Sequence, residues 1–215
     1  MNRFLIRYLL LSTVALLLSC TSAYRSLKPA SVDIACANKM IPSSIATSWY
    51  QASIDVAKKH LSGLVLIKNM PDSSQRVVFT SEAGVTFFDF GFKRPGKFMV
   101  YSIIKKLNRR PVIKTLQKDF ELMLGVPFAR GGLQSWKTQE ETFFGVIQEK
   151  ETVYFITDKD CSSLRRLELG TRQKRKVSIE IKGAGYPSAD TLNITHYTFP
   201  LKIRLTRFQK NDSSQ

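Results

Sequence analysis

Residues 109–125 read "RRPVIKTLQKDFELMLG", and this stretch has the period of an α-helix in a chain that elsewhere alternates. Pro111 stands where the first turn of a helix tolerates proline, and Gly125 stands where helices commonly end. Its apolar residues form one stripe at 3.6 residues per turn: Ile113, Leu116, Phe120, Met123 and Leu124. The sequence therefore predicts one long amphipathic helix over residues 111–124.

On both sides of this helix the apolar residues alternate, as they do in half-buried β-strands. In "VTFFDFGF", for example, Phe88, Phe90 and Phe92 share one face. Similar runs are "YQASIDV", "HLSGLVLIK", "QRVVFTS" and "KFMVYSII" before the helix, and "TFFGVIQ", "TVYFITD", "SLRRLELG", "KVSIEIKG", "TLNITHYTF" and "LKIRLTRF" after it. Because the connections are short, we expect a mainly β protein of the α+β class, with ten or eleven strands in an antiparallel meander.

The N-terminus, "MNRFLIRYLLLSTVALLLSC", has the pattern of an export signal. A positively charged start with Arg3 and Arg7 precedes a Leu-rich run that is too short to span a bilayer as a helix. The run ends in Leu-Leu-Ser-Cys, which resembles the lipobox of bacterial lipoproteins. That resemblance implies that residues 1–19 are removed as a signal peptide and that Cys20 is acylated. An uncleaved anchor, or a chance Cys beside a standard signal, is the alternative.

The compartment changes the interpretation of the basic composition. The formal net charge is +16, and loss of Arg3 and Arg7 would leave +14. In an exported protein this charge indicates anionic lipid headgroups, lipopolysaccharide or an acidic partner rather than nucleic acid. Thr21, in place of Asp after the acylated Cys, implies by the enterobacterial sorting rule an outer-membrane lipoprotein that faces the periplasm. The basic residues are scattered, however, which also fits solvated strand edges and turns.

Two further cysteines remain after acylation of Cys20. An even remainder in an oxidising compartment permits one disulfide between Cys36 and Cys161, worth about 4 kcal/mol in the chain-entropy model. Two separate buried thiols are the alternative. Residues 20–46 show little periodicity, so we expect a tether with a short ordered piece near Cys36, followed by a single domain over residues 47–210.

Residues 47–208 resemble the LolA/LolB-like family of bacterial envelope proteins. The pattern is a strand pair ending in "SGLVLIK", then "RVVFTSEAGVTFFDF", one helix, and a closing run "LNITHYTFPLKIRLTRF". The resemblance implies a curved antiparallel sheet, an incomplete β-barrel, with a helix on the concave face. LolB-type proteins accept other lipoproteins' acyl chains in this lumen and carry a protruding loop with an exposed Leu. Here the turn at Ser81–Gly84 has no apolar tip, and Met70 in the neighbouring turn is a weak substitute.

We therefore expect a membrane-anchored lipoprotein that binds a lipid or lipoprotein acyl chain in an apolar half-barrel. Alternation on adjacent strands selects these residues as the acyl-chain lining: Leu64, Leu66, Phe88, Phe90, Phe144, Val146, Phe155, Ile179 and Ile203. If they form a filled core instead, the protein is a non-catalytic interaction lipoprotein of an envelope assembly. A connected apolar lumen of several hundred Å³ distinguishes the two.

Catalytic motifs are missing from the sequence. His60 and His196 lack the spacing of metal ligands, and no GxSxG string is present. "GFKRPGKF" is close to a phosphate-binding loop, but Phe98 replaces the required Ser or Thr and no helix follows. His196 shares a face with Leu192 and Ile194, which favours a satisfied core histidine. We expect no enzyme activity, no metal and no cofactor, with membrane lipid, acyl chains, other lipoproteins and anionic headgroups as partners.

Overall fold

The computed structural model describes residues 23–41, 45–56, 58–93, 95–183, 185–186 and 189–208. The expected signal peptide and Cys20, the expected acylation site, lie outside the described residues. Within those described ranges, no helix is both long enough and apolar enough to cross a membrane.

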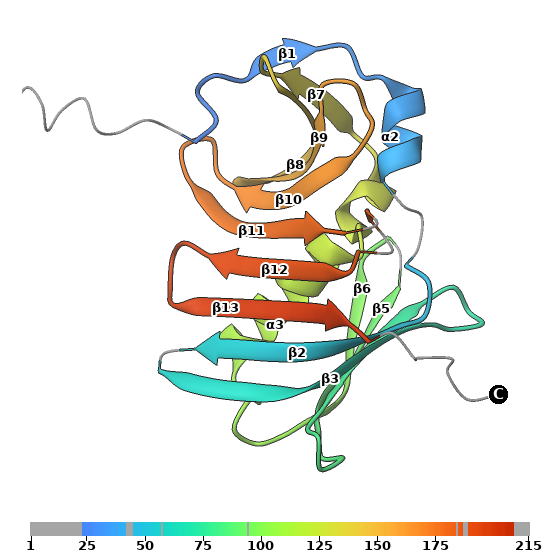
Figure 1. Cartoon of the computed structure of the whole chain (residues 1–215), viewed down its shortest axis with the longest axis vertical. Helices are drawn as coiled ribbons and strands as arrows, with labels where there is room; N and C mark the ends of the chain where they lie inside the picture. The colour runs from blue at the N-terminus through green and yellow to red at the C-terminus, as the bar shows by residue number, and fades with distance from the viewer. Residues whose placement is uncertain are drawn as a thin grey trace, which may run out of the picture.

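The described chain forms one antiparallel sheet of thirteen strands, strongly curved (Figure 1). The strands are β1 (Lys28–Ala30), β2 (Ser48–Val56), β3 (Lys59–Asn69), β4 (Gln75–Thr80), β5 (Thr86–Lys93), β6 (Lys97–Ile103), β7 (Leu133–Lys137), β8 (Glu141–Gln148), β9 (Glu151–Asp158), β10 (Leu164–Gly170), β11 (Arg175–Lys182), β12 (Thr191–His196) and β13 (Leu201–Arg207). Their order across the sheet is β1-β7-β8-β9-β10-β11-β12-β13-β2-β3-β4-β5-β6. The predicted fold class, a mainly β curved antiparallel sheet, is confirmed.

Three helical segments accompany the sheet in the described ranges: α2 (Ile34–Met40), α3 (Arg110–Met123) and the 3₁₀ turn η1 (Val126–Arg130). The helix α3 is the one predicted from the sequence, shifted by a single residue. Pro111 lies in its first turn, and Gly125 just beyond it has a φ of 66°, a left-handed conformation that glycine adopts at little cost.

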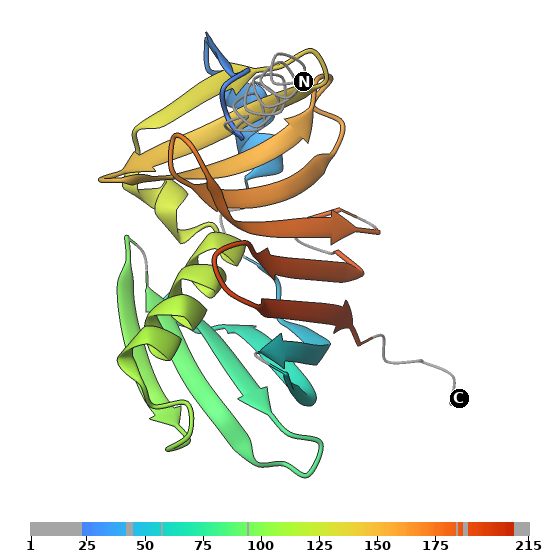
Figure 2. The same ribbon diagram turned by 90° about the vertical axis from the view of Figure 1, so that its left-hand side faces the viewer.

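Strand order explains why α3 covers the concave face. In sequence β6 is followed by α3, η1 and β7, yet β6 and β7 lie at opposite sides of the sheet. The chain must therefore cross from one side to the other, and α3 makes that crossing between the two halves of the curved sheet (Figure 2). The two outermost strands, β1 and β6, do not pair with each other, so the barrel stays incomplete.

The apolar stripe of α3 packs on aromatic residues of the inner face. The ring of Phe120 lies 5.7 Å from that of Phe88 and 6.3 Å from that of Phe92, centroid to centroid. Leu122 and Met123, one turn on, are buried as well. Burial of these large side chains removes apolar area from water, and this is what fixes the helix to the sheet.

The segment expected as a tether, residues 20–46, is ordered over much of its described length. The strand β1 pairs with β7 at the edge of the sheet, and α2 buries Cys36, Ala37 and Met40 in the main core. Asp33 caps α2 by accepting a hydrogen bond from the backbone N of Cys36 at 2.9 Å. A strand of three residues and a helix of seven are too short to give a periodic signal, and the same is true of the five-residue β7.

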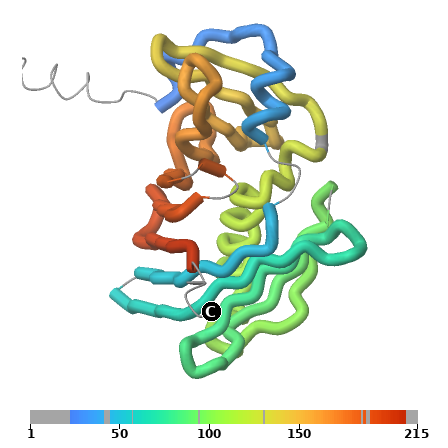
Figure 3. Tube along the Cα trace, turned by 45° about the vertical axis from the view of Figure 1, so that its right-hand side comes forward, coloured from blue at the N-terminus to red at the C-terminus, as the bar shows by residue number. Residues whose placement is uncertain are grey.

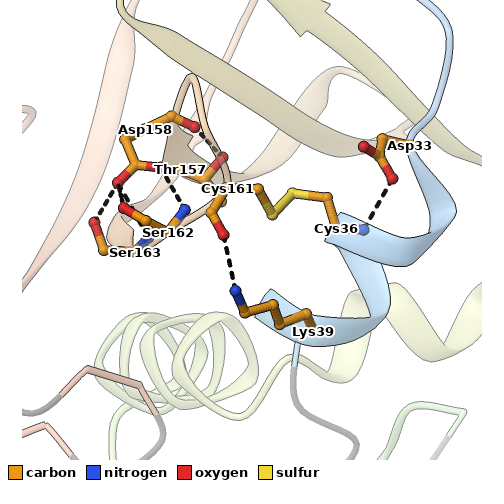
Figure 4. The surroundings of a disulfide bond; sticks show 8 residues. All are labelled: Asp33, Cys36, Lys39, Thr157, Asp158, Cys161, Ser162 and Ser163. Carbon is orange, nitrogen blue, oxygen red and sulfur yellow. Dashed lines mark hydrogen bonds between the residues drawn. A yellow bond between two sulfur atoms is a disulfide. The ribbon is translucent and has the colours of Figure 1, made fainter.

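A disulfide joins Cys36 of α2 to Cys161 in the β9–β10 turn, with Cα atoms 5.8 Å apart (Figure 4). The Nζ of Lys39 donates a hydrogen bond to the carbonyl of Cys161 at 3.2 Å. In the same turn Ser162 and Ser163 donate to the carboxylate of Asp158, and the bonds from Ser162 foremost lower its pKa to about 2. The disulfide thus holds α2 beside the strands β7–β10 (Figure 3).

Candidate functional site

An apolar pocket of about 400 Å³ lies between the first half of α3 and the sheet. Thr115 is the only one of its lining residues with a polar side chain. The lining comes from α3, the loop before it, the strands β2 to β5, and the β12–β13 turn with the start of β13: Ile54, Val56, Leu61, Phe79, Phe88, Leu107, Pro111, Val112, Thr115, Leu116, Phe199 and Leu201. Such a surface offers an apolar ligand contacts along its whole length and few hydrogen bonds.

The pocket exists because α3 packs closely along its second half and less closely along its first. Phe120, Leu122 and Met123 are at most 2% exposed. By contrast Val112, near the start of α3, remains half-buried. The preceding loop supplies Leu107 as a further wall, so the pocket opens where the helix begins.

Most of the predicted acyl-chain lining lies elsewhere. Of those nine residues only Phe88 lines the pocket. Six others are in the packed interior, none more than 5% exposed: Phe90, Phe144, Val146, Phe155, Ile179 and Ile203. In the half of the barrel that contains the strands β7 to β10, Phe128 of η1 packs edge-on against Phe155 of β9, with ring centroids 4.4 Å apart. The 3₁₀ turn therefore fills the space that the sequence had suggested as a lumen.

Leu64 and Leu66 were assigned to the wrong face of β3. Their neighbours Val65 and Ile67 are buried, pairing with Phe79 and Val77 of β4, whereas Leu64 and Leu66 are only half-buried. The run "GLVLIK" is apolar at successive positions, so alternation cannot decide which residues point inward. The register with β4 decides it.

Most of the pocket lining that sequence reasoning missed lies on strands and on α3, and two of the missed residues lie in connections. Leu107 precedes the helix, and Phe199 lies in the β12–β13 turn. Leu107 belongs to no periodic run, and Phe199 ends the run "TLNITHYTF" beyond the last residue of β12, so neither was selected as lining. Two signals were available: the predicted stripe of α3, whose member Leu116 lines the pocket, and the alternating run "YQASIDV", which contains Ile54 and Val56.

A buried polar pair lies directly behind the pocket. The Nε2 of His196 in β12 is 3.0 Å from Oδ2 of Asp119 in α3, and the two side chains are 3% and 1% exposed. Burial raises the pKa of the Asp119 carboxyl, and the hydrogen bond with His196 opposes that rise. The imidazole also packs on the pocket residue Phe199, with ring centroids 4.5 Å apart. His196 is thus the satisfied core histidine that the sequence predicts.

Comparison with known proteins finds similarity in structure alone. No protein-family model and no curated protein sequence matches the chain. A LolA superfamily protein from Nitrosomonas europaea aligns over 84% of this chain and 93% of its own, with 6% identity and a TM-score of 0.49.

Two further solved structures are similar over the same share of this chain. One is a DUF1329 family protein from Desulfovibrio piger, with 92% of its own length covered. The other is a putative outer membrane lipoprotein-sorting protein domain from Vibrio parahaemolyticus, with 91% covered. Both have 9% identity and a TM-score of 0.41. The half-barrel that the sequence resemblance implies is the architecture that this chain has.

Proposed function

We propose that the protein is a bacterial envelope lipoprotein, anchored through acylated Cys20, that binds an acyl chain of a lipid or lipoprotein in the pocket under α3. The apolar pocket of about 400 Å³ is the observation that carries this proposal. Each CH₂ transferred from water into such a surface is worth about 0.8 kcal/mol, so a chain of modest length would bind with useful affinity. The Thr after Cys20 favours the outer membrane, facing the periplasm.

The size of the pocket limits its content. Ligand pockets in proteins range over roughly 300–1,000 Å³, and this one lies near the lower bound. We therefore expect a single acyl chain rather than a complete multi-chain lipid. The remainder of a larger ligand would stay outside, beyond the start of α3.

A second candidate function is a non-catalytic interaction lipoprotein of an envelope assembly. The filled half of the barrel favours it, because Phe144, Phe155 and Ile179 are fully buried and Phe128 of η1 packs on Phe155. In that case the pocket under α3 would bind no free lipid.

A fluorescent fatty-acid probe distinguishes the two candidates. The chain from residue 20 with Cys20→Ser keeps every described residue, and its fold is checked by circular dichroism. We expect saturable binding at micromolar concentrations. The variant Thr115→Trp, which places a large ring in the pocket, should weaken binding at least tenfold.

The matched control is Lys114→Trp, one residue earlier on the exposed side of α3. It should leave the affinity unchanged. If the folded parent protein shows no saturable binding, or if both Trp variants behave alike, the acyl-chain proposal is contradicted and the interaction lipoprotein is favoured.

A further inference from the structure

The strand pairing places half of the connections at one end of the half-barrel. Gly170 at the end of β10 pairs with the start of β9, so the β10–β11 turn lies beside the β8–β9 turn. The end of β12 pairs with the start of β11, and the start of β13 pairs with the end of β2, so the β12–β13 turn lies at this end as well. The β2–β3, β8–β9, β10–β11 and β12–β13 turns therefore share one end with the pocket residues Val56, Phe199 and Leu201. This end, called the mouth end, is at the left of Figure 1 and faces the viewer in Figure 2.

The beginning of the described chain is fixed at the same end. The backbone N of Ala23 donates to the carbonyl of Gln173 in the β10–β11 turn at 3.3 Å. The hydroxyl of Tyr24 donates to the carboxylate of Glu168 at 2.9 Å. Because Cys20 comes only three residues before Ala23, the chain between them reaches at most about 10 Å. Any lipid on Cys20 would therefore attach at the mouth end.

The contact of Tyr24 is part of a buried ionic cluster. Glu168 is fully buried, and its Oε1 lies 2.6 Å from the Nε of Arg166 and 2.9 Å from an Nη of Arg175. Arg166 also pairs with Glu141 through both of its terminal nitrogens. Breaking one partner of such a cluster would leave an uncompensated buried charge, so the entry point of the chain is rigidly held.

Charge differs between the connections at the two ends of the half-barrel, although Lys93, Lys97, Lys137 and Lys182 are exposed at strand termini of the far end. Among the described residues of the mouth-end connections, the loop before α3 carries Lys105, Lys106 and Arg109, and the turns carry Lys58, Lys150, Arg172 and Lys174. All seven side chains are exposed, and the acids there are Glu82 and Glu149. At the far end, the described connections carry four acids, Asp72, Glu140, Asp160 and Asp190, and one cation, Lys159.

Exposed aromatic side chains lie among the mouth-end cations. Tyr197 and Phe199, in the β12–β13 turn, are 53% and 39% exposed. Phe199 lines the pocket, and Arg175 lies over the ring of Tyr197 at 5.7 Å. Aromatic residues beside Lys and Arg are typical of surfaces that lie in the headgroup region of a bilayer.

We propose that the mouth end docks on an anionic lipid bilayer, so that the pocket under α3 opens directly onto the membrane surface. The position of the chain entry rests on the proposed anchor at Cys20, whereas the charge asymmetry and the exposed aromatics do not depend on it. Basic residues near an anionic leaflet are attracted over about one Debye length, which is enough to orient a molecule that is already tethered. Ligand transfer would then need no passage through water.

The test measures which end touches the bilayer. The full chain is purified from membranes and reconstituted into vesicles of phosphatidylethanolamine with phosphatidylglycerol. A thiol-reactive fluorophore is placed at Thr198→Cys in the mouth end or at Gln139→Cys in the far end, both exposed positions without charge. Spin-labelled lipid should quench the label at 198 at least twofold more than the label at 139, with the unsubstituted protein as the labelling blank.

Charge reversal gives the matched comparison. Lys105→Glu with Lys106→Glu and Arg109→Glu should remove the difference between the two labels. The far-end set Lys137→Glu, Lys159→Glu and Lys182→Glu should preserve it. Equal quenching of the two labels, or stronger quenching at 139, in protein retained by the vesicles would overturn the docking proposal.

Failure of the anchor is a separate result. The anchor is tested separately with vesicles of neutral lipid, and protein that does not sediment with them lacks the membrane anchor. In that case docking is measured by sedimentation of the protein with the anionic vesicles. Loss of that sedimentation in the mouth-end reversal alone supports docking without an anchor. Sedimentation that is unchanged by the mouth-end reversal contradicts docking.

Discussion

The pair of Asp119 and His196 is the residue-scale feature with the clearest energetic consequence. It links α3 to β12, and Oδ1 of Asp119 has no hydrogen-bond partner among the described residues. His196→Phe would leave a buried carboxylate unpaired, so we expect a loss of about 3–5 kcal/mol in the free energy of unfolding. Asp119→Leu combined with His196→Phe should recover most of that loss. Urea unfolding measures both, and a double variant as unstable as the single one would contradict this view of the pair.

The deficit of His196→Phe should depend on pH. Because burial raises the pKa of Asp119 above its ordinary value of 3.8, the folded state binds a proton at a pH where the unfolded chain does not. The stability of His196→Phe should therefore rise as pH falls through the raised pKa, with the full gain present below pH 3.8. If His196→Phe lowers the free energy of unfolding by the same amount at pH 8 and at pH 4, the lost contact and not the carboxylate charge causes the destabilisation.

At the element scale, α2 is held by its disulfide. A helix of seven residues is too short to persist without tertiary contacts. The disulfide spans a sequence separation of 125 residues, and the chain-entropy model gives about 4 kcal/mol or slightly more for a loop of that length. Cys36→Ser with Cys161→Ser should lower the free energy of unfolding by that amount in urea. Unfolding of the parent protein that is insensitive to reductant would contradict the disulfide.

Elements with a clear period could be predicted from the sequence, and short ones could not. The stripe on α3 and the alternation in eleven strands indicated one long helix and an antiparallel meander, and the family resemblance implied a curved sheet with the helix on its concave face, as observed. The strand β7 follows Gly131 and Gly132 and has five residues, so it gave no signal. Face assignment failed for Leu64 and Leu66, because strand register depends on the partner β4.

At the scale of the whole molecule, the half-barrel is filled on one side and open on the other. The position of the open pocket depends on where α3 leaves the sheet and on η1, which packs on Phe155. Both are tertiary features without a sequence period. The sequence could therefore predict an apolar concave face but not which part of it stays open.

Two substitutions distinguish the buried floor of the pocket from its mouth. Phe88 is 1% exposed and stacks on Phe90 at 4.5 Å, so Phe88→Arg should cost several kcal/mol and unfold the domain. Val56 is only half-buried at the end of β2 and lines the pocket, so Val56→Arg should stay folded and lose most of its probe binding. Thermal melts and probe titration check the pair, and full probe binding by Val56→Arg would exclude the pocket as the site.

Photo-crosslinking of a fatty acid that carries a diazirine near its methyl end tests most directly whether an acyl chain occupies the pocket under α3. The folded protein is irradiated with the probe, digested, and mapped by mass spectrometry. We expect adducts on peptides that cover residues 107–116 and 199–201, suppressed by excess unlabelled fatty acid. Adducts that are spread over the outer face of the sheet, or that excess fatty acid does not suppress, would contradict an acyl-chain site in this pocket.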